Sequence, residues 1–198
     1  GSYVGGLAGE NSGTVSRCYA TGPVTGSSVV GGLIGLNCST VSGCSAAGAA
    51  TGTGNYVGGL AGRNTGGTVR GCYATGAAWG AVYSVGGLVG ENSGTVSNCY
   101  ARGAATGNAN VGGLVGNNVG AVSDCYATGS AAGSGFLGGL VGSNVGSVNN
   151  SYWDTQTSGQ ATSAGGGTGT NTAAMKQQAT FAGWDFTNMW RMTEDVTY

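Results

Sequence analysis

The stretch Val85-Gly-Gly-Leu-Val-Gly-Glu-Asn-Ser-Gly-Thr-Val-Ser-Asn-Cys-Tyr-Ala101 decides the fold, because its pattern recurs along most of the chain. The Gly-Gly pair returns at residues 5–6, 31–32, 58–59, 86–87, 112–113 and 138–139, at intervals of 26, 27, 28, 26 and 26 residues. A nearly fixed period of this size predicts a repeat architecture, in which each unit packs only on its neighbours. The chain therefore divides into six repeats over residues 1–152 and a different segment over residues 153–198.

Five further positions of the repeat are nearly constant: a leucine after the Gly-Gly pair, then an asparagine, a valine, a cysteine and a tyrosine. We call each such set of equivalent positions a column. The asparagine column is Asn11, Asn37, Asn64, Asn92, Asn118 and Asn144. The cysteine column is Cys18, Cys44, Cys72, Cys99 and Cys125, with Ser151 in the sixth repeat. The tyrosine column is Tyr19, Tyr73, Tyr100, Tyr126 and Tyr152, with Ser45 in the second repeat.

Strands explain this repeat better than helices do. Glycine supplies 45 of the 198 residues, and each glycine in a helix costs roughly 1 kcal/mol. The residues between the glycines are rich in Val, Thr, Tyr, Ser and Cys, which favour strands. The sequence therefore predicts an all-β fold, a parallel β-solenoid (β-helix) of about six coils of about 26 residues. Each coil is expected to hold two or three short strands that pair in register, about 4.8 Å from the next coil.

Alternation along Thr14-Val-Ser-Arg-Cys-Tyr-Ala-Thr21 predicts which columns face inward. It places Cys18 on one face with serine and alanine, and Val15, Arg17 and Tyr19 on the other. Because the charge of Arg17 belongs in water, we expect an inward cysteine column and outward valine and tyrosine columns. The tyrosine column is then a candidate exposed interaction surface. The alternative is a bulge or corner beside the cysteine that turns tyrosine inward as well.

The cysteine and asparagine columns both have structural interpretations. Ladder neighbours about 4.8 Å apart lie slightly beyond the usual Cβ separation of a disulfide, so we favour buried reduced thiols over disulfides. Cys38 stands outside the column. No Cys-x-x-Cys pair and no histidine is present, so we expect no metal and no cofactor. The asparagines are expected at turns, with their amides hydrogen-bonded from coil to coil, and ligand binding is the alternative.

The segment from residue 153 is expected to cap the sixth coil. Residues 155–172 have the composition of a loop, and residues 172–181 predict a short helix with Thr172 as the N-cap. The open end of a solenoid exposes apolar side chains and unpaired backbone, which terminal caps cover. A tryptophan-lined sugar site is the alternative. The candidate cap aromatics are Trp153, Phe181, Trp184, Phe186 and Trp190.

Charge and composition bear on function mainly by exclusion. The chain has 6 Lys+Arg, 7 Asp+Glu and no histidine, which argues against a nucleic-acid partner. No apolar run reaches the roughly 18 residues that a membrane span needs, so no membrane insertion is expected. Glu10 and Glu91 share a column three coils apart, about 14 Å at ladder spacing, which exceeds the separation that glycosidases use. We therefore expect no catalytic residues.

The first coil is expected to offer a bare parallel edge. Gly1-Ser-Tyr-Val4 is in phase with Gly54-Asn-Tyr-Val57, so the sequence begins inside a repeat. Such an edge is a template for another strand. We expect earlier repeats of a longer chain, or an identical subunit, to cover it. A contact between subunits would be head-to-tail, would propagate as a fibre, and would be relieved by charges at Val4 and Val15.

The repeat over residues 85–101 resembles the GLUG repeat, named for its glycine–hydrophobic–glycine core. The stretches from Tyr152 to Thr155 and from Met175 to Phe186 resemble the segment that often follows such repeats. GLUG repeats occur in secreted bacterial and archaeal surface proteins, among them filamentous-haemagglutinin-like adhesins, and beside the catalytic parts of immunoglobulin-A peptidases. The resemblance implies an extracellular β-solenoid module at the cell surface. The peptidase activity does not transfer, because this chain has no His-Glu-x-x-His motif.

Three functions are compatible with such a module. The first is a non-catalytic stalk or scaffold of a cell-surface adhesin, and the second is a self-assembling subunit of an extracellular filament or sheath. The third is a flat-face binder of carbohydrate or ice that uses the tyrosine and threonine columns, with surface glycans as partners. Thr14, Thr40, Thr68 and Thr95 align for ice binding, but Ala121 and Ser147 end that column.

Overall fold

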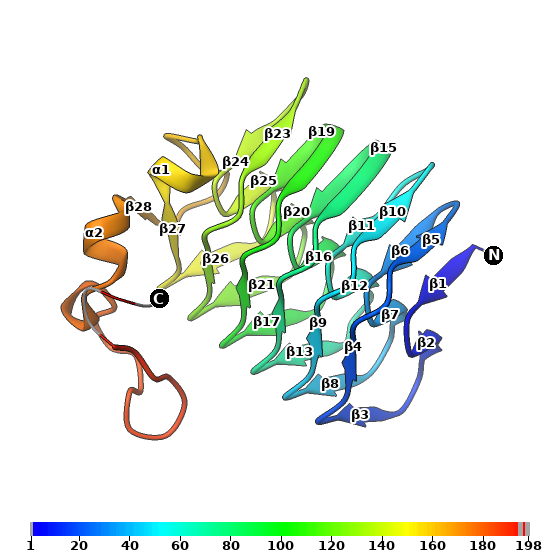
Figure 1. Cartoon of the computed structure of the whole chain (residues 1–198), viewed down its shortest axis with the longest axis horizontal. Helices are drawn as coiled ribbons and strands as arrows, with labels where there is room; N and C mark the ends of the chain where they lie inside the picture. The colour runs from blue at the N-terminus through cyan, green and yellow to red at the C-terminus, as the bar shows by residue number, and fades with distance from the viewer. Residues whose placement is uncertain (1, 194–195, 197–198) are drawn as a thin grey trace.

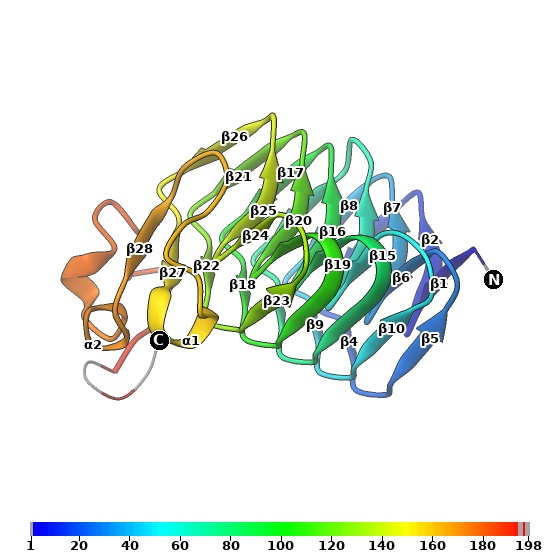
Figure 2. The ribbon, with the colours of Figure 1, turned by 90° about the horizontal axis from the view of Figure 1, so that it is seen from above.

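The computed structural model describes residues 2–193 and residue 196, and it confirms a parallel β-solenoid of about six coils. Successive coils lie side by side from the N-terminal to the C-terminal end of the molecule (Figure 1). The segment after β27 (Tyr152–Asp154) lies at the far end of this stack, as the view from above also shows (Figure 2). None of the helices in the described part of the chain is long and apolar enough to cross a membrane.

Four parallel sheets, here named A to D, form the walls of the solenoid. Sheet A contains β1 (Tyr3–Gly5), β5 (Val24–Gly26), β6 (Val29–Gly31), β10 (Ala50–Gly52), β11 (Val57–Gly58), β15 (Ala78–Gly86), β19 (Ala105–Gly112), β23 (Ala131–Gly133) and β24 (Leu137–Gly138). Sheet B contains β2 (Ala8–Asn11), β7 (Ile34–Asn37), β12 (Ala61–Asn64), β16 (Val89–Asn92), β20 (Val115–Asn118) and β25 (Val141–Asn144).

Sheets C and D complete each coil. Sheet C contains β3 (Thr14–Ser16), β8 (Thr40–Ser42), β13 (Thr68–Arg70), β17 (Thr95–Ser97), β21 (Ala121–Ser123) and β26 (Ser147–Asn149). Sheet D contains β4 (Tyr19–Ala20), β9 (Ser45–Ala46), β14 (Tyr73–Ala74), β18 (Tyr100–Ala101), β22 (Tyr126–Ala127), β27 and β28 (Thr168–Thr170). The coils therefore hold more strands than the two or three expected, because corners divide each coil into very short strands.

The strands pair in register, so equivalent residues of successive repeats are direct neighbours. Asn64 pairs with Asn37 on one side and with Asn92 on the other, and Val69 lies between Val41 and Val96 in the same way. Every pairing between coils is parallel. The columns read from the sequence are thus continuous ladders along the molecule.

The expectation that the valine column faces outward is wrong. Val41, Val69, Val96 and Val122 are fully buried. The cysteines three residues further along each coil are fully buried as well: Cys44, Cys72, Cys99 and Cys125. The corner residue between them has a positive φ in every coil: Arg17 (52°), Gly43 (61°), Gly71 (59°), Asn98 (52°), Asp124 (52°) and Asn150 (44°). This left-handed corner shifts the alternation, so valine and cysteine both point inward while tyrosine points outward. Glycine, asparagine and aspartate at five of these positions were the sequence signal for it.

The interior contains two apolar clusters. The larger one stacks the leucine, valine, cysteine and alanine columns of sheets B, C and D, and Trp153 closes it at the last coil. The smaller one lies inside the bend of sheet A and includes Val30, Val57, Val85 and Val111. The second glycine of the first five Gly-Gly pairs lies against the alanine of sheet D, and Gly139 of the sixth pair lies against Trp153. A Cβ atom built on Gly87 would lie 3.0 Å from the Ala101 Cβ. Glycine is required there because the backbone approaches so closely.

Residues 153–170 cover the end of the sixth coil. Trp153 is buried, and the Gly139 and Val141 backbone N–H groups donate to Thr162 O (3.0 Å) and Ser163 Oγ (2.8 Å). The predicted loop over 155–172 contains α1 (Thr155–Ser158) and β28, which pairs with β27. The predicted helix over 172–181 is shorter than expected: α2 (Thr172–Met175) is capped by Asn171 rather than by Thr172, and the 3₁₀ helix η1 (Gln178–Thr180) follows.

Candidate functional site

The asparagine column forms an unbroken chain of side-chain hydrogen bonds through the solenoid. Each Nδ2 donates to the Oδ1 of the next coil, at 2.7, 2.7, 2.8, 2.7 and 2.7 Å from Asn11 to Asn144. The amides also hold their own turns: Asn92 Oδ1 accepts from Gly94 N at 3.2 Å, and Asn92 Nδ2 donates to Gly94 O at 3.3 Å. Asn37, Asn64, Asn92 and Asn118 are fully buried. Their hydrogen-bonding groups are used within the fold, which favours a structural role over ligand binding.

The cysteine column stacks inside the solenoid as free thiols. Cys44, Cys72, Cys99 and Cys125 are buried, Cys18 is partly buried at the N-terminal end, and all six cysteines are unpaired. Each thiol donates to a backbone carbonyl of its own corner, for example Cys99 Sγ to Ser97 O at 3.1 Å. Burial raises the pKa of Cys44 and Cys99, and a hydrogen bond with Cys99 together with burial raises that of Cys72. These thiols therefore stay protonated and unreactive near neutral pH.

We expect thiol labelling of the native protein at pH 8 to separate the cysteines by position. Cys38 is exposed and should react first, and Cys18 should react more slowly. The four buried cysteines should react only when the protein unfolds, because the reagent cannot reach their side chains in the folded state. For Cys44, Cys72 and Cys99 the raised pKa also disfavours the reactive thiolate. Mass spectrometry of peptides after timed labelling measures this. Rapid modification of several buried cysteines in the folded protein would contradict the stacked arrangement.

The tyrosine column points away from the solenoid wall, and part of it is covered. Tyr73 and Tyr100 stack with ring centroids 4.9 Å apart, and Tyr100 and Tyr126 stack at 5.0 Å. Tyr19 is 75% exposed, whereas Tyr126 is 3% and Tyr152 is 8% exposed. The prediction of an exposed surface is therefore wrong for Tyr126 and Tyr152.

An aromatic segment of the same chain, residues 181–190, covers the last rungs of this tyrosine ladder. The Phe181 ring lies 5.0 Å from that of Tyr152, and the Trp190 ring lies 5.7 Å from that of Tyr126. Trp184 Nε1 donates to Asn150 O at 3.0 Å. Phe181, Trp184, Phe186 and Trp190 thus pack on the side of the solenoid, at sheet D, rather than over the end of coil six as expected. Trp153 alone of the candidate cap aromatics closes that end.

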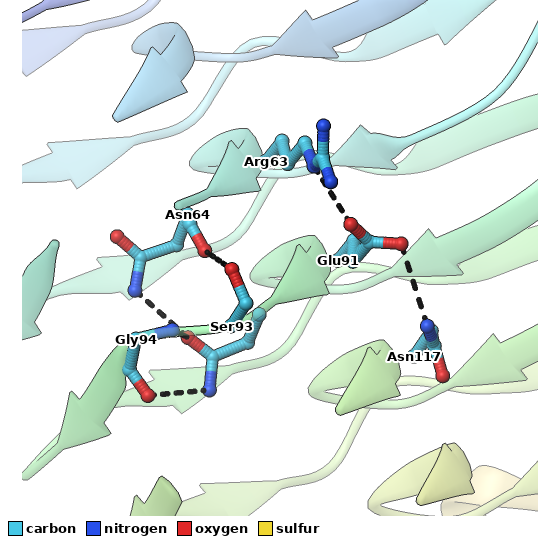
Figure 3. A network of polar contacts seen from close by, with 7 residues as sticks. Arg63, Asn64, Glu91, Ser93, Gly94 and Asn117 are labelled. Carbon is cyan, nitrogen blue, oxygen red and sulfur yellow. Dashed lines mark hydrogen bonds and ion pairs between the residues drawn. The ribbon is translucent and has the colours of Figure 1, made fainter. Parts of the chain in front are cut away.

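Three carboxylates in the described part of the chain serve the fold. Glu91 is buried and accepts from Arg63 Nε at 2.7 Å and from Asn117 Nδ2 at 3.4 Å on the outside of sheet B (Figure 3). Asp154 caps α1 and accepts from Thr172 Oγ1 at 2.7 Å. Asp185 accepts from the side-chain and backbone N–H groups of Asn188, which lowers its pKa. Glu194 and Asp195 lie outside the described residues, and within the described part no three metal-ligating side chains form a group.

The Arg63–Glu91 ion pair was not anticipated from the sequence, although a signal for it was present. The two residues occupy the same column in adjacent coils, and in-register pairing makes such residues neighbours. Opposite charges one repeat apart therefore predict an ion pair in this fold.

With the columns and their register established, the comparison with protein families is direct. The family model of the GLUG motif matches residues 1–25, 53–79, 81–106 and 107–132, more than half of the chain. The chain belongs to the GLUG-motif family. Searches of curated proteins and of solved structures gave no match. The unmatched second GLUG coil has Ser45 in place of tyrosine, yet β9 pairs in register with β4 and β14. The second coil of this chain therefore keeps its register without the outward tyrosine.

Proposed function

We propose that this chain is a non-catalytic extracellular structural module that serves as the stalk or scaffold of a cell-surface adhesin. The observation that carries the proposal is the unbroken amide ladder through in-register coils, since it joins the coils into one stiff rod. The extracellular setting and the adhesin are what membership of the GLUG family suggests. A rod of repeats suits a spacer because its length follows the number of coils.

The absence of catalysis is supported by the use of the polar side chains. The sequence has no histidine, so acid–base chemistry would fall to carboxylates. Glu91, Asp154 and Asp185 instead form an ion pair, a helix cap and a turn. The two best-buried polar columns, asparagine and cysteine, are engaged with the backbone and with each other.

The stalk proposal is tested by lengthening the rod. Three extra copies of Gly87–Gly112, one complete 26-residue coil, inserted after Gly112 should lengthen the rod by about 14 Å at 4.8 Å a coil. Spin labels at the exposed Cys38 and at an Asn149→Cys substitution, in a Cys18→Ser background, report this distance by pulsed electron paramagnetic resonance. We expect a narrow distribution displaced by about that length. A broad distribution, or an unchanged distance, would show that the repeats do not form a rigid spacer.

Display on a cell surface separates a spacer from a binder. The chain is placed between a membrane anchor and a reporter domain, with Tyr19→Ser and Tyr73→Ser variants as the comparison. A spacer presents the reporter equally well with or without these outward tyrosines. Adhesion that the chain itself confers and that the tyrosine variants abolish would favour the flat-face binder instead.

We propose that another β-solenoid coil, from a longer chain or from an identical subunit, covers the edge formed by β1 to β4. Leu7 is 49% exposed there, whereas its equivalents Leu33 and Leu60 are fully buried. Because residues 153–170 cover the opposite end, a contact between copies of this chain ends at a pair and does not propagate as a fibre. Val4 and Val15 pack inward, so charges there would damage the core, and Leu7 is the better position for a charged substitution.

A further inference from the structure

A cavity lies where the aromatic segment ends on sheet D. Its volume is about 340 Å³, and its lining includes Asn98, Tyr100, Arg102, Trp190 and Arg191. The solenoid wall supplies the first three residues, and the C-terminal segment supplies the two others. This volume lies within the range of small-ligand sites, roughly 300–1,000 Å³.

Two aromatic rings form the apolar part of this cavity. Tyr100 and Trp190 lie with ring centroids 6.3 Å apart and planes inclined by 48°, so they enclose a wedge. Both residues are partly exposed. Tyr73, the next rung of the ladder, stacks on Tyr100 and is 38% exposed, which extends the platform outward. The negative faces of such rings attract the polarised C–H groups on one face of a sugar ring.

The polar groups of the cavity are mainly hydrogen-bond donors. The Arg102 guanidinium carbon lies 5.2 Å from the centre of the Tyr100 ring, and its Nη2 donates to Tyr126 Oη at 3.4 Å. Arg191 is exposed on the other side. Trp190 Nε1 is buried and has no acceptor among the described residues, which is unusual for a buried donor. Asp124, one coil beyond Asn98 in the corner column, accepts from Asn150 Nδ2 at 2.7 Å.

We infer that this cavity binds a saccharide that carries a carboxylate, such as a uronic acid unit. Guanidinium groups hold carboxylates in paired hydrogen bonds, and two of the six cations of the chain meet here. The inclined rings suit the apolar C–H face of a pyranose. An acidic peptide would satisfy the arginines but has no flat apolar ring face for the two aromatic walls.

The test is calorimetric titration of residues 1–198 with a trisaccharide of galacturonic acid at low salt. Neutral trigalactose and a triglutamate peptide are titrated in parallel. We expect the acidic sugar to bind at least ten times more tightly than either control. Its affinity should fall as the salt concentration rises, because the arginines are at the surface. If triglutamate binds as tightly as the acidic sugar, the ligand is an acidic peptide and the saccharide inference is overturned. No heat with the acidic sugar up to 10 mM, or equal affinity for trigalactose, would overturn the inference.

Variants place the binding in this cavity. Arg102→Gln and Arg191→Gln should each lower the affinity for the acidic sugar about tenfold. Trp190→Phe keeps an aromatic ring and should lower this affinity severalfold. Arg17→Gln is the matched control, since Arg17 is an exposed arginine of the same corner region, three coils away. Circular dichroism checks that each variant is folded. Binding that all three cavity variants leave unchanged, or that Arg17→Gln removes equally, would also overturn the inference.

Discussion

Gly87→Ala is expected to prevent this chain from folding into the solenoid. A Cβ atom on Gly87 would overlap the carbonyl oxygen of Gly113 in the next coil and would lie 3.0 Å from the Ala101 Cβ across the interior. The Gly87 N–H also donates to Gly112 O at 3.1 Å, so the backbone cannot move away without breaking this hydrogen bond to the next coil. Relief requires separating two coils in the middle of the stack. We expect a loss in the free energy of unfolding of more than about 4 kcal/mol, at the upper end for single substitutions.

Gly22→Ala is the matched control for this steric argument. No atom lies within 4 Å of a Cβ built on Gly22, and its φ is not positive. Alanine there should be neutral or should stabilise the fold by about 0.4–1 kcal/mol, because it restricts the unfolded chain. Far-UV circular dichroism and urea unfolding of both variants measure the difference. A Gly87→Ala protein as stable as Gly22→Ala would show that the coils are not packed backbone against backbone.

Asn92→Ala should lower the free energy of unfolding by about 3 kcal/mol or more. The Asn92 amide accepts from Asn64 (2.8 Å) and donates to Asn118 (2.7 Å), and it also holds Gly94. Removal leaves the oxygen of the fully buried Asn118 without its donor and the half-buried Gly94 N–H without its acceptor. Each buried polar group left unpaired costs about 1–3 kcal/mol, and the cavity adds to that cost.

Asn144→Ala is the control for the ladder, because Asn144 is its last rung and is only partly buried. Asn118 Nδ2 keeps Gly120 O and Ser147 O as acceptors when the Asn144 oxygen is removed, so we expect a loss of about 1 kcal/mol. Urea unfolding followed by circular dichroism gives both values. Equal effects at Asn92 and Asn144 would mean that the amides act as independent turn residues and not as a continuous ladder.

The sequence by itself determined the length of the repeat, the formation of strands rather than helices, and the neighbours of each repeated residue. The reason is geometric: in an in-register parallel stack, residues of equal phase always lie next to one another. The fold class and the stacking of Asn64 between Asn37 and Asn92 follow from this. The Arg63–Glu91 pair was open to the same reasoning, because its two residues share a column.

Only the tertiary structure decided which columns face inward and where the aromatic segment lies. One left-handed residue at each corner, such as Asn98, reverses which face of the strand the following side chains point to. Strict alternation places Val96 and Cys99 on opposite faces, whereas both are buried. Residues 181–190 have no repeat, so no phase relation assigns them neighbours. Their position on Tyr100, Tyr126 and Tyr152 follows from packing of large rings against an apolar ladder. That packing buries two tyrosines which their sequence places on the outside, and it creates the cavity between sheet D and Trp190.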